Sequence, residues 1–173
     1  MKSTPWLRFS WDLSQFTESL TQLPVRFTIR EARKDERELT LQLIKRSMSM
    51  DSSWTNGMQQ ALEIIETSAV KVFEMKPVVP CLLLCDGPRP VGASILQAAQ
   101  SSPWHLESGP CILSEYCNRG LGSLLLEASL KHLKGLGLEH ARAITYKTTT
   151  LARFLYPKFD SVSEPYDLPG EEE

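Results

Sequence analysis

The sequence predicts an α/β protein in which helices pack against a mixed β-sheet. Segments with alternating apolar residues, typical of strands with one buried face, are interspersed with segments whose apolar residues recur at helical spacing. Their predicted order over residues 25–162 is β-α-α-β-β-β-α-β-α-β, which favours a mixed sheet over a doubly wound parallel one. With 173 residues, of which 42% are hydrophobic, the chain suits one domain with a single core.

The charge balance limits the classes of partner. The chain has 19 Lys+Arg against 21 Asp+Glu, so we expect neither nucleic-acid nor membrane binding. The apolar runs are too short to span a bilayer, and residues 1–8 do not read as a secretory signal, so a cytoplasmic location is expected. The 4 cysteines are then expected to be buried, reduced thiols, and their spacing predicts no metal site.

An N-terminal segment is predicted to precede the main domain. Leu7, Phe9 and Trp11 alternate with polar residues, as in a short strand. Apolar residues at helical spacing then predict a helix over residues 12–23, which Pro24 would end. The predicted division is an N-terminal extension over residues 1–24, a main domain over residues 25–162 and a loose acidic tail over residues 163–173.

The main domain contains segments of both periodicities. Residues 25–31 alternate strictly, and the residues after Asn56 form the clearest apolar stripe of a helix. Residues 86–90 are rich in glycine and proline and predict the turn of a hairpin, whereas Pro110 requires a sheet edge or a bulge. The predicted strands are 25–31, 81–85, 91–97, 105–113, 141–145 and 159–162, and the predicted helices are 35–50, 56–76, 120–136 and 148–155.

The most informative segment runs from Leu113 to Leu125, where a strand leads through a glycine-containing turn into a helix. The free amide N–H groups and the positive dipole end at such a helix start bind phosphate. Gly120 and Gly122 have no side chains to shield these amides. A dinucleotide fingerprint would need a third glycine where Leu125 stands, and the Gly-Lys-Ser/Thr of a P-loop does not occur. A tight packing turn without a ligand is the alternative interpretation.

The run Cys117-Asn118-Arg119-Gly120-Leu121-Gly122 resembles motif A of the GNAT-type N-acetyltransferase superfamily, Gln/Arg-x-x-Gly-x-Gly/Ala. Because the backbone amides of that motif hold the pyrophosphate of acetyl-CoA, the resemblance implies acetyl-CoA as the cosubstrate. Both glycines match, whereas the cysteine replaces the first residue. The cofactor-binding residues implied around the motif are Ile112, Leu113, Asn118, Arg119, Gly120, Leu121, Gly122 and Ser123.

The segment from Thr149 to Tyr156 resembles a second pattern of the same family, Asn-x-x-Ala-x-x-Phe-Tyr. Ala152 and Tyr156 match it in type and spacing, and Thr149 replaces the asparagine. The resemblance implies that Thr149 and Ala152 contact the cofactor and that Tyr156 lies beside the CoA sulfur. Its hydroxyl would there protonate the departing thiolate as a general acid. A tyrosine whose ring only packs is the alternative.

The residues that would activate and hold an acceptor are less clearly marked. Several family members carry a carboxylate base in the strand before the phosphate turn, which implies Glu107, and His105 lies in the same strand. A solvated strand residue is the alternative for each. In this family the link between the first two helices covers the substrate groove. The candidates there are Met48, Met50, Asp51 and Trp54, which would otherwise only fill the core.

Together the resemblances imply a GNAT-like acyltransferase fold with a shortened C-terminal strand pair. The implied function is transfer of an acetyl group from acetyl-CoA to a primary amine of a small molecule or peptide, by direct attack. A catalytically degenerate CoA-binding or regulatory module is the alternative. Residues 163–170 contain two prolines and predict no strand, so one sheet edge would remain open. We expect residues 7–11, or a second subunit of a homodimer, to cover that edge.

Overall fold

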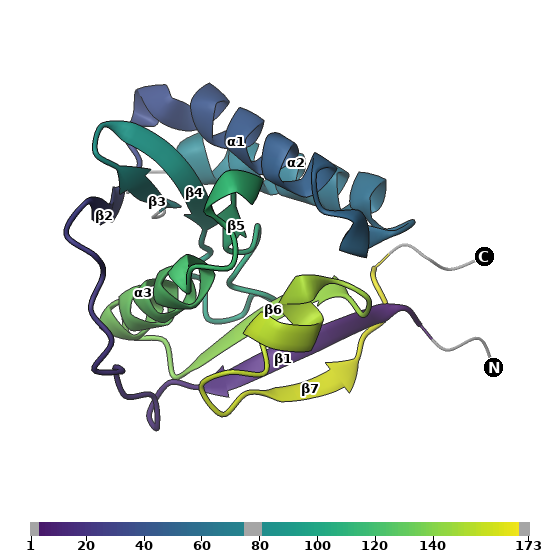
Figure 1. Ribbon diagram of the computed structural model, residues 1–173. Coiled ribbons are helices and arrows are strands. Elements are labelled where there is room, and N and C mark those ends of the chain that lie inside the picture. The colour runs from purple at the N-terminus through teal and green to yellow at the C-terminus, as the bar shows by residue number, and fades with distance from the viewer. Residues whose placement is uncertain (1–3, 75–80, 170–173) are drawn as a thin grey trace.

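Two antiparallel sheets form the framework of the fold. The computed structural model describes residues 4–74 and 81–169, and these contain seven strands and three α-helices (Figure 1). The α/β fold expected from the sequence is confirmed. The strands are β1 (Trp6–Asp12), β2 (Phe27–Glu31), β3 (Cys81–Asp86), β4 (Arg89–Ile95), β5 (Cys111–Ile112), β6 (His140–Tyr146) and β7 (Val162–Pro165), and the helices are α1 (Arg37–Ser49), α2 (Met58–Glu74) and α3 (Leu121–Gly135).

The first sheet has the strand order β2-β3-β4-β5 and is covered on both faces. Figure 1 shows α1 and α2 together on one side of it and α3 on the other. This explains the sequence of β3, because a strand with two covered faces is apolar throughout rather than alternating. Its residues 81–85 are all buried. The hairpin expected around residues 86–90 is confirmed, since β3 and β4 pair antiparallel through it.

The second sheet has the order β6-β1-β7, so the N-terminal strand β1 is its central strand. Trp6 is opposite Tyr146 of β6, and Leu7 is opposite Pro165 of β7. The expectation that residues 7–11 cover a sheet edge is confirmed. The expectation that residues 163–170 form no strand is wrong, because β7 pairs with β1. Pro165 is tolerated there because it ends an edge strand, where its missing N–H removes no bond to a second neighbour.

The helix predicted over residues 12–23 does not form. Asp12 accepts hydrogen bonds from the backbone and hydroxyl of Ser14, and Leu13 donates to the Glu139 carbonyl, so the chain turns after β1. The segment must then cross α3 to reach β2. An extended chain covers about 3.3 Å per residue and a helix only about 1.5 Å, so the extended form spans this distance and a helix does not. Ser19 is held to α3 by two hydrogen bonds to the Glu127 carboxylate.

Three further predicted elements are shorter or displaced. The strand expected over residues 105–113 is reduced to β5 and a bridge at Leu106, because Gly109 and Pro110 interrupt it. The helix expected over residues 148–155 is a single π-helical turn, Leu151–Leu155. The last strand begins at residue 162 rather than 159, after two residues with positive φ.

Some predictions cannot be compared with the structure. The end of the helix near Pro77 and Pro80 and the acidic residues 171–173 lie outside the described residues. Among the residues described, no helix has the length and apolar character needed to cross a membrane.

A buried ion pair joins β2 to the turn that precedes α1. The guanidinium of Arg30 donates to both carboxylate oxygens of Glu36, at 2.7 and 2.8 Å, and the Arg33 backbone N–H donates to one of them. Glu36 is only 6% exposed. The hydrogen bonds from Arg30, with smaller contributions from Arg33, lower the pKa of Glu36 from 4.5 to about 2.

We predict that Glu36→Gln lowers the free energy of unfolding at pH 7 by about 2 kcal/mol, because a charge-assisted pair is lost. The depressed folded-state pKa means that this contribution is present above about pH 4.5 and disappears as the pH falls toward 2. Denaturant unfolding at pH 7 and pH 3 should therefore give a smaller difference from wild type at pH 3. Glu38→Gln, at an exposed position of α1, is the matched control; a pH-independent difference would contradict the assignment.

We predict that deletion of residues 1–12 abolishes cooperative thermal unfolding, because β6 and β7 then lose the strand between them. Circular dichroism and gel filtration provide the readout, and a synthetic peptide of residues 4–14 should restore the transition. Leu20→Ser is the control, since this side chain is 99% exposed. Unchanged melting and oligomeric state after the deletion would show that β1 is dispensable.

Candidate functional site

The turn before α3 presents backbone amides to an open groove. Asn118 and Gly120 have φ values of 62° and 76°, so the chain reverses sharply on either side of Arg119 before the helix begins at Leu121. No side chain caps the start of α3, and its first turn contains no acidic residue. The N–H groups of this turn and the positive end of the helix dipole are therefore available to an anion.

A groove of about 520 Å³ lies in front of this helix start. It runs between the end of α1, the following link, β5 and the π-helical turn, where the two sheets separate beyond β5. Five of the predicted cofactor-binding residues line it, namely Ile112, Asn118, Gly120, Gly122 and Ser123. Met48, Met50, Asp51 and Trp54, expected on the acceptor side, also line this groove.

The other predicted cofactor-binding residues do not line the groove. Leu113, Leu121 and Ala152 are buried in the core, at 4%, 2% and 7% exposure. Thr149 is fully buried, and its hydroxyl bonds with Thr145 and with the Tyr146 carbonyl. Arg119 donates instead to the Glu115 carbonyl and lies over the Tyr116 ring.

Several groove residues were not predicted from the sequence. Lys158 adds a cation, and its Nζ lies 2.5 Å from the Ser123 hydroxyl at the start of α3. The sequence places this lysine directly after Tyr156 and Pro157, which could have suggested a role near the site, but only the fold shows that it lies beside α3. The remaining unpredicted lining residues are Ser47, Pro110, Cys111, Ser114, Cys117, Thr150, Leu151, Phe154 and Leu155.

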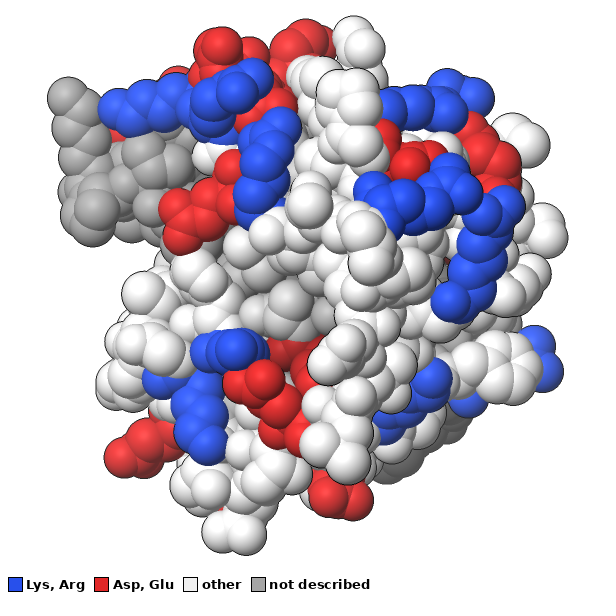
Figure 2. Space-filling view, turned by 60° about the vertical axis from the view of Figure 1, so that its left-hand side comes forward, with Lys and Arg blue, Asp and Glu red and all other residues white. Residues whose placement is uncertain are grey.

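The surface charge is mixed on the face drawn in Figure 2. Lysine and arginine side chains there lie beside aspartate and glutamate side chains, and uncharged residues form a band between the charged groups. Ion pairs such as Lys45–Glu66 and Arg89–Glu115, whose side chains are all partly exposed, place charges of opposite sign next to each other on the protein surface. This face therefore carries no extended field of one sign.

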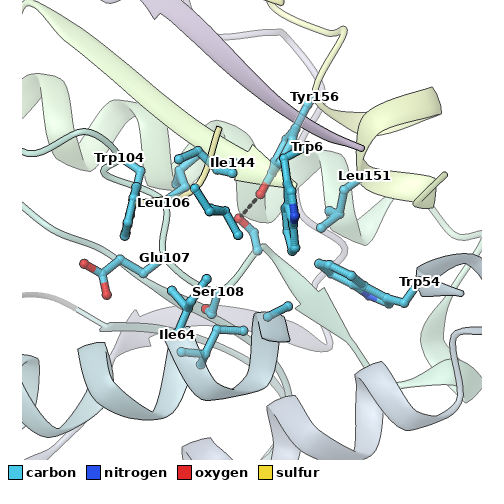
Figure 3. A pocket seen from close by; sticks show the side chains of 14 residues that line it. Trp6, Trp54, Ile64, Trp104, Leu106, Glu107, Ser108, Ile144, Leu151 and Tyr156 are labelled. Carbon is cyan, nitrogen blue, oxygen red and sulfur yellow. Dashed lines mark hydrogen bonds between the residues drawn. The ribbon is translucent and has the colours of Figure 1, made fainter. Parts of the chain in front are cut away.

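A second, smaller cavity adjoins the groove. Its volume is about 40 Å³, and it shares Trp54 and Leu151 with the groove. Trp6 of β1 and Trp104 also wall it, so three tryptophans from distant parts of the sequence meet there (Figure 3). The complete lining is Trp6, Trp54, Ala61, Ile64, Ile65, Trp104, Leu106, Glu107, Ser108, Gly109, Ile144, Leu151, Tyr156 and Leu168.

Comparison with known proteins identifies the fold. No family model and no curated protein matches the sequence. Among solved structures, a GCN5-related N-acetyltransferase from Sphaerobacter thermophilus superimposes with a TM-score of 0.63 at 15% identity, over 95% of this chain and 50% of that one. The chain has the fold of the GCN5-related N-acetyltransferases.

Two further structures share this GNAT fold with the chain. A Drosophila protein matches with a TM-score of 0.64 and 16% identity, over 95% of this chain and 49% of that one. A conserved protein of unknown function from Staphylococcus epidermidis matches with a TM-score of 0.60 and 13% identity, over 92% and 57%. The chain thus spans about half the length of these three structures.

Within the GNAT fold, Tyr156 lines the small cavity and not the groove. Its ring is 1% exposed and packs against Phe9 and Trp11 of β1. Its hydroxyl donates a 2.8 Å hydrogen bond to the Gly109 carbonyl (Figure 3). Burial raises the pKa of Tyr156 well above its usual range, so the phenol stays protonated.

Glu107 and His105 occupy different environments, although they are two residues apart. Glu107 is half-buried and lines the cavity, and Figure 3 draws it on the side away from Trp54 and Tyr156. His105 is 1% exposed; its Nδ1 accepts from the Arg142 backbone N–H, and its Nε2 lies 3.1 Å from the Ala99 carbonyl. Burial lowers the pKa of His105, and both ring nitrogens are engaged, so this candidate base is a structural residue.

The cysteines and potential metal ligands add no further site. Cys81, Cys85 and Cys111 are buried and Cys117 is exposed, and all 4 are free thiols, as expected from the sequence except for the exposure of Cys117. Burial raises the pKa of Cys111 to about 12, which makes it a poor nucleophile. Within residues 4–74 and 81–169, no group of three or more His, Cys, Asp or Glu side chains is placed to hold a metal ion.

We predict that Tyr156→Phe lowers the free energy of unfolding by about 1–2 kcal/mol, because the buried Gly109 carbonyl loses its donor. Urea unfolding measures this difference. Tyr166→Phe, at a half-buried surface tyrosine, removes the same atom without a comparable cost. Equal stabilities of the two variants would show that the Tyr156 hydroxyl contributes nothing to the fold.

Proposed function

We propose that this protein is an N-acetyltransferase that transfers the acetyl group of acetyl-CoA to a primary amine. One observation carries the proposal: the uncapped, acid-free start of α3 opens into a groove within a GNAT fold. An α-helix start of this kind binds phosphate groups through its amides and its dipole. The groove volume of about 520 Å³ lies in the range of small-molecule sites.

The residues of the groove fit the parts of acetyl-CoA. The amides of residues 120–123 would hold the pyrophosphate, and Lys158 would add a positive charge beside them. Apolar side chains farther along, including Met48, Ile112 and Leu155, would pack against the pantetheine arm. Gly122 allows the backbone to approach the phosphates, because it has no Cβ.

The junction of groove and cavity suits direct transfer. An amine in the cavity would meet the thioester at Trp54 and Leu151, the two residues that border both spaces. The amine nitrogen attacks the thioester carbonyl carbon, a C–N bond forms and the C–S bond breaks. The leaving thiolate takes up one proton, and the amine loses one. Holding both reactants in contact supplies much of the acceleration in such reactions.

The proton transfers are assigned to Glu107 and Tyr156 within the same proposal. Glu107 supplies the only carboxylate among the described cavity-lining residues, and because it lies on the side away from Trp54, it would receive the amine proton through bridging water. Tyr156 would act toward the thiolate. Its single hydroxyl proton is donated to the Gly109 carbonyl, so the hydroxyl would have to turn away from that carbonyl to donate a hydrogen bond to the thiolate, and burial opposes complete transfer of the proton. Tyr156→Phe would then lower kcat only modestly, by less than the 10²–10⁴ typical of a general acid.

We predict that Gly122→Ala weakens acetyl-CoA binding by about 10-fold, or about 1.4 kcal/mol, without loss of stability. A Cβ at this position would meet the described protein atoms no closer than 3.8 Å, so the fold accepts it, but the methyl group would lie beside Ile112 and Leu155 in the groove that the ligand would fill. Gly135→Ala, in the same helix with no heavy atom near its Cβ, is the matched control.

Thermal shift with increasing acetyl-CoA measures both variants. Wild type and Gly135→Ala should be stabilised by about 2.7 kcal/mol at 100 times the dissociation constant, and Gly122→Ala should need more ligand. Thiol release in the presence of amines then tests turnover. Stabilisation by acetyl-CoA without acetylation of any amine would favour the degenerate CoA-binding module instead.

A further inference from the structure

We propose that the Ser53 hydroxyl is a positioning group for acetyl transfer. It joins the link between α1 and α2, residues 50–57, to the turn that follows β6, and it thereby sets the separation of Trp54 and Leu151. These are the two residues that border both the groove and the small cavity. The inference rests on the proposed function and adds a residue to its site.

One hydrogen bond connects the two chain segments that carry these bordering residues. The Thr150 backbone N–H donates to the Ser53 hydroxyl oxygen at 3.0 Å. Trp54 comes directly after Ser53 in the sequence, and Leu151 comes directly after Thr150. Loss of this hydrogen bond would therefore displace Trp54 and Leu151 relative to each other, because each is one backbone step away from it.

Asp51 fixes the direction of the Ser53 hydroxyl. One Asp51 carboxylate oxygen accepts from the Ser53 hydroxyl at 2.5 Å and from the Ser53 backbone N–H at 3.0 Å. The single hydroxyl proton is thus directed to Asp51, and the oxygen acts as the acceptor for Thr150. Donation to a carboxylate also polarises the hydroxyl oxygen, which strengthens its hydrogen bond with the Thr150 N–H.

The main chain of the link is held at two points. The Thr148 hydroxyl donates to the Ser53 carbonyl at 2.6 Å. Nearer α2, Gly57 packs so closely on the ring of Tyr146 that an added Cβ would lie 2.6 Å from a ring carbon. Trp54 therefore lies between two fixed points of the link.

The backbone of the link is strained between these points. Thr55 has a φ of 50° and a ψ of −114°, a conformation that is rare for a β-branched residue. Such a backbone persists only where the surrounding structure imposes it. Loss of the contacts at Ser53 would therefore allow the link to relax, and Trp54 would shift with it.

Trp54 is placed to orient the reactants. Its side chain is 6% exposed, and Figure 3 shows its ring directed into the cavity beside Leu151. An amine and a thioester that meet there react rapidly only at the correct separation, and a misplacement of about 1 Å costs about 100-fold in rate. Ser53 lines neither the groove nor the cavity, so it acts through Trp54 and Leu151.

Steady-state kinetics of three variants test this role. Thiol release is measured with acetyl-CoA and ethylamine, a small amine chosen because the cavity of about 40 Å³ has space for only about three water molecules. Ser53→Ala should lower kcat by about 10-fold and change the KM for acetyl-CoA by less than about twofold. Ser53→Thr retains the hydroxyl and should retain most of the wild-type kcat. Ser52→Ala, at the exposed neighbouring serine, is the matched control and should behave as wild type.

Thr148→Val provides an independent variant of the same contact. It releases the Ser53 carbonyl and leaves the Ser53 hydroxyl in place. It should also lower kcat without weakening the binding of acetyl-CoA, and it decides the test if Ser53→Ala does not fold.

Acrylamide quenching of tryptophan fluorescence tests whether Ser53 acts through Trp54. Ser53→Ala should raise the quenching constant by about 1.5-fold, because a tryptophan that is 6% exposed in the wild type becomes accessible. The rise should disappear when Trp54→Phe is combined with Ser53→Ala. This readout requires no turnover.

The outcomes separate this inference from the proposed function. A wild-type kcat in Ser53→Ala, or a lower kcat with unchanged quenching, would overturn the inference and leave the acetyltransferase standing. A loss of acetyl-CoA affinity as large as the loss of kcat would also overturn it, since that result indicates general damage to the site. If the wild type acetylates neither ethylamine nor any larger amine, the proposed function fails and the inference fails with it.

Discussion

The insertion of β1 between β6 and β7 is the constraint on which the rest of the structure depends. It hydrogen-bonds the first described strand to the last, and it places Trp6, Phe9 and Trp11 in the core. The rings of Phe9 and Trp11 pack on Tyr156, and Trp6 walls the small cavity. Both the wall of this cavity and the tyrosine that lines it are therefore positioned by residues that precede the first helix.

The groove depends on a different feature, the boundary between the two sheets. β5 and β6 belong to separate sheets, which are bridged at Leu106 and by backbone hydrogen bonds of His105, so the groove forms where one sheet ends. The uncapped start of α3 faces that groove, where water or a ligand satisfies its amides. A sheet boundary supplies the space and a helix start supplies the charge, and neither requires particular side chains beyond small ones at 120 and 122.

The sequence predicted those parts of the site that depend on adjacent residues. The turn at Gly120 and Gly122 was predictable because backbone freedom and helix capping are properties of adjacent residues. That residues 7–11 pair with a sheet edge was also predictable, but the insertion of β1 between β6 and β7 was not, because alternation identifies a strand but not its partners. Residues 12–23 have the periodicity of a helix, but a helix would be too short to cross α3 and reach β2, so the segment is extended instead. Ala152 matched the motif in type and spacing and Thr149 replaced its asparagine, yet both side chains are buried in the core, and that geometry is set by packing.

The central position of β1 also has a consequence for biosynthesis. Among the described strands, the ribosome releases β1 first and its neighbours β6 and β7 last. Until β6 and β7 emerge, its tryptophans and phenylalanine have no permanent partner, and closing so long a loop is entropically slow. Nascent chains would thus expose an apolar, strand-forming segment while residues 13–139 are made, which is the condition that recruits chaperones and favours exchange of strands between chains.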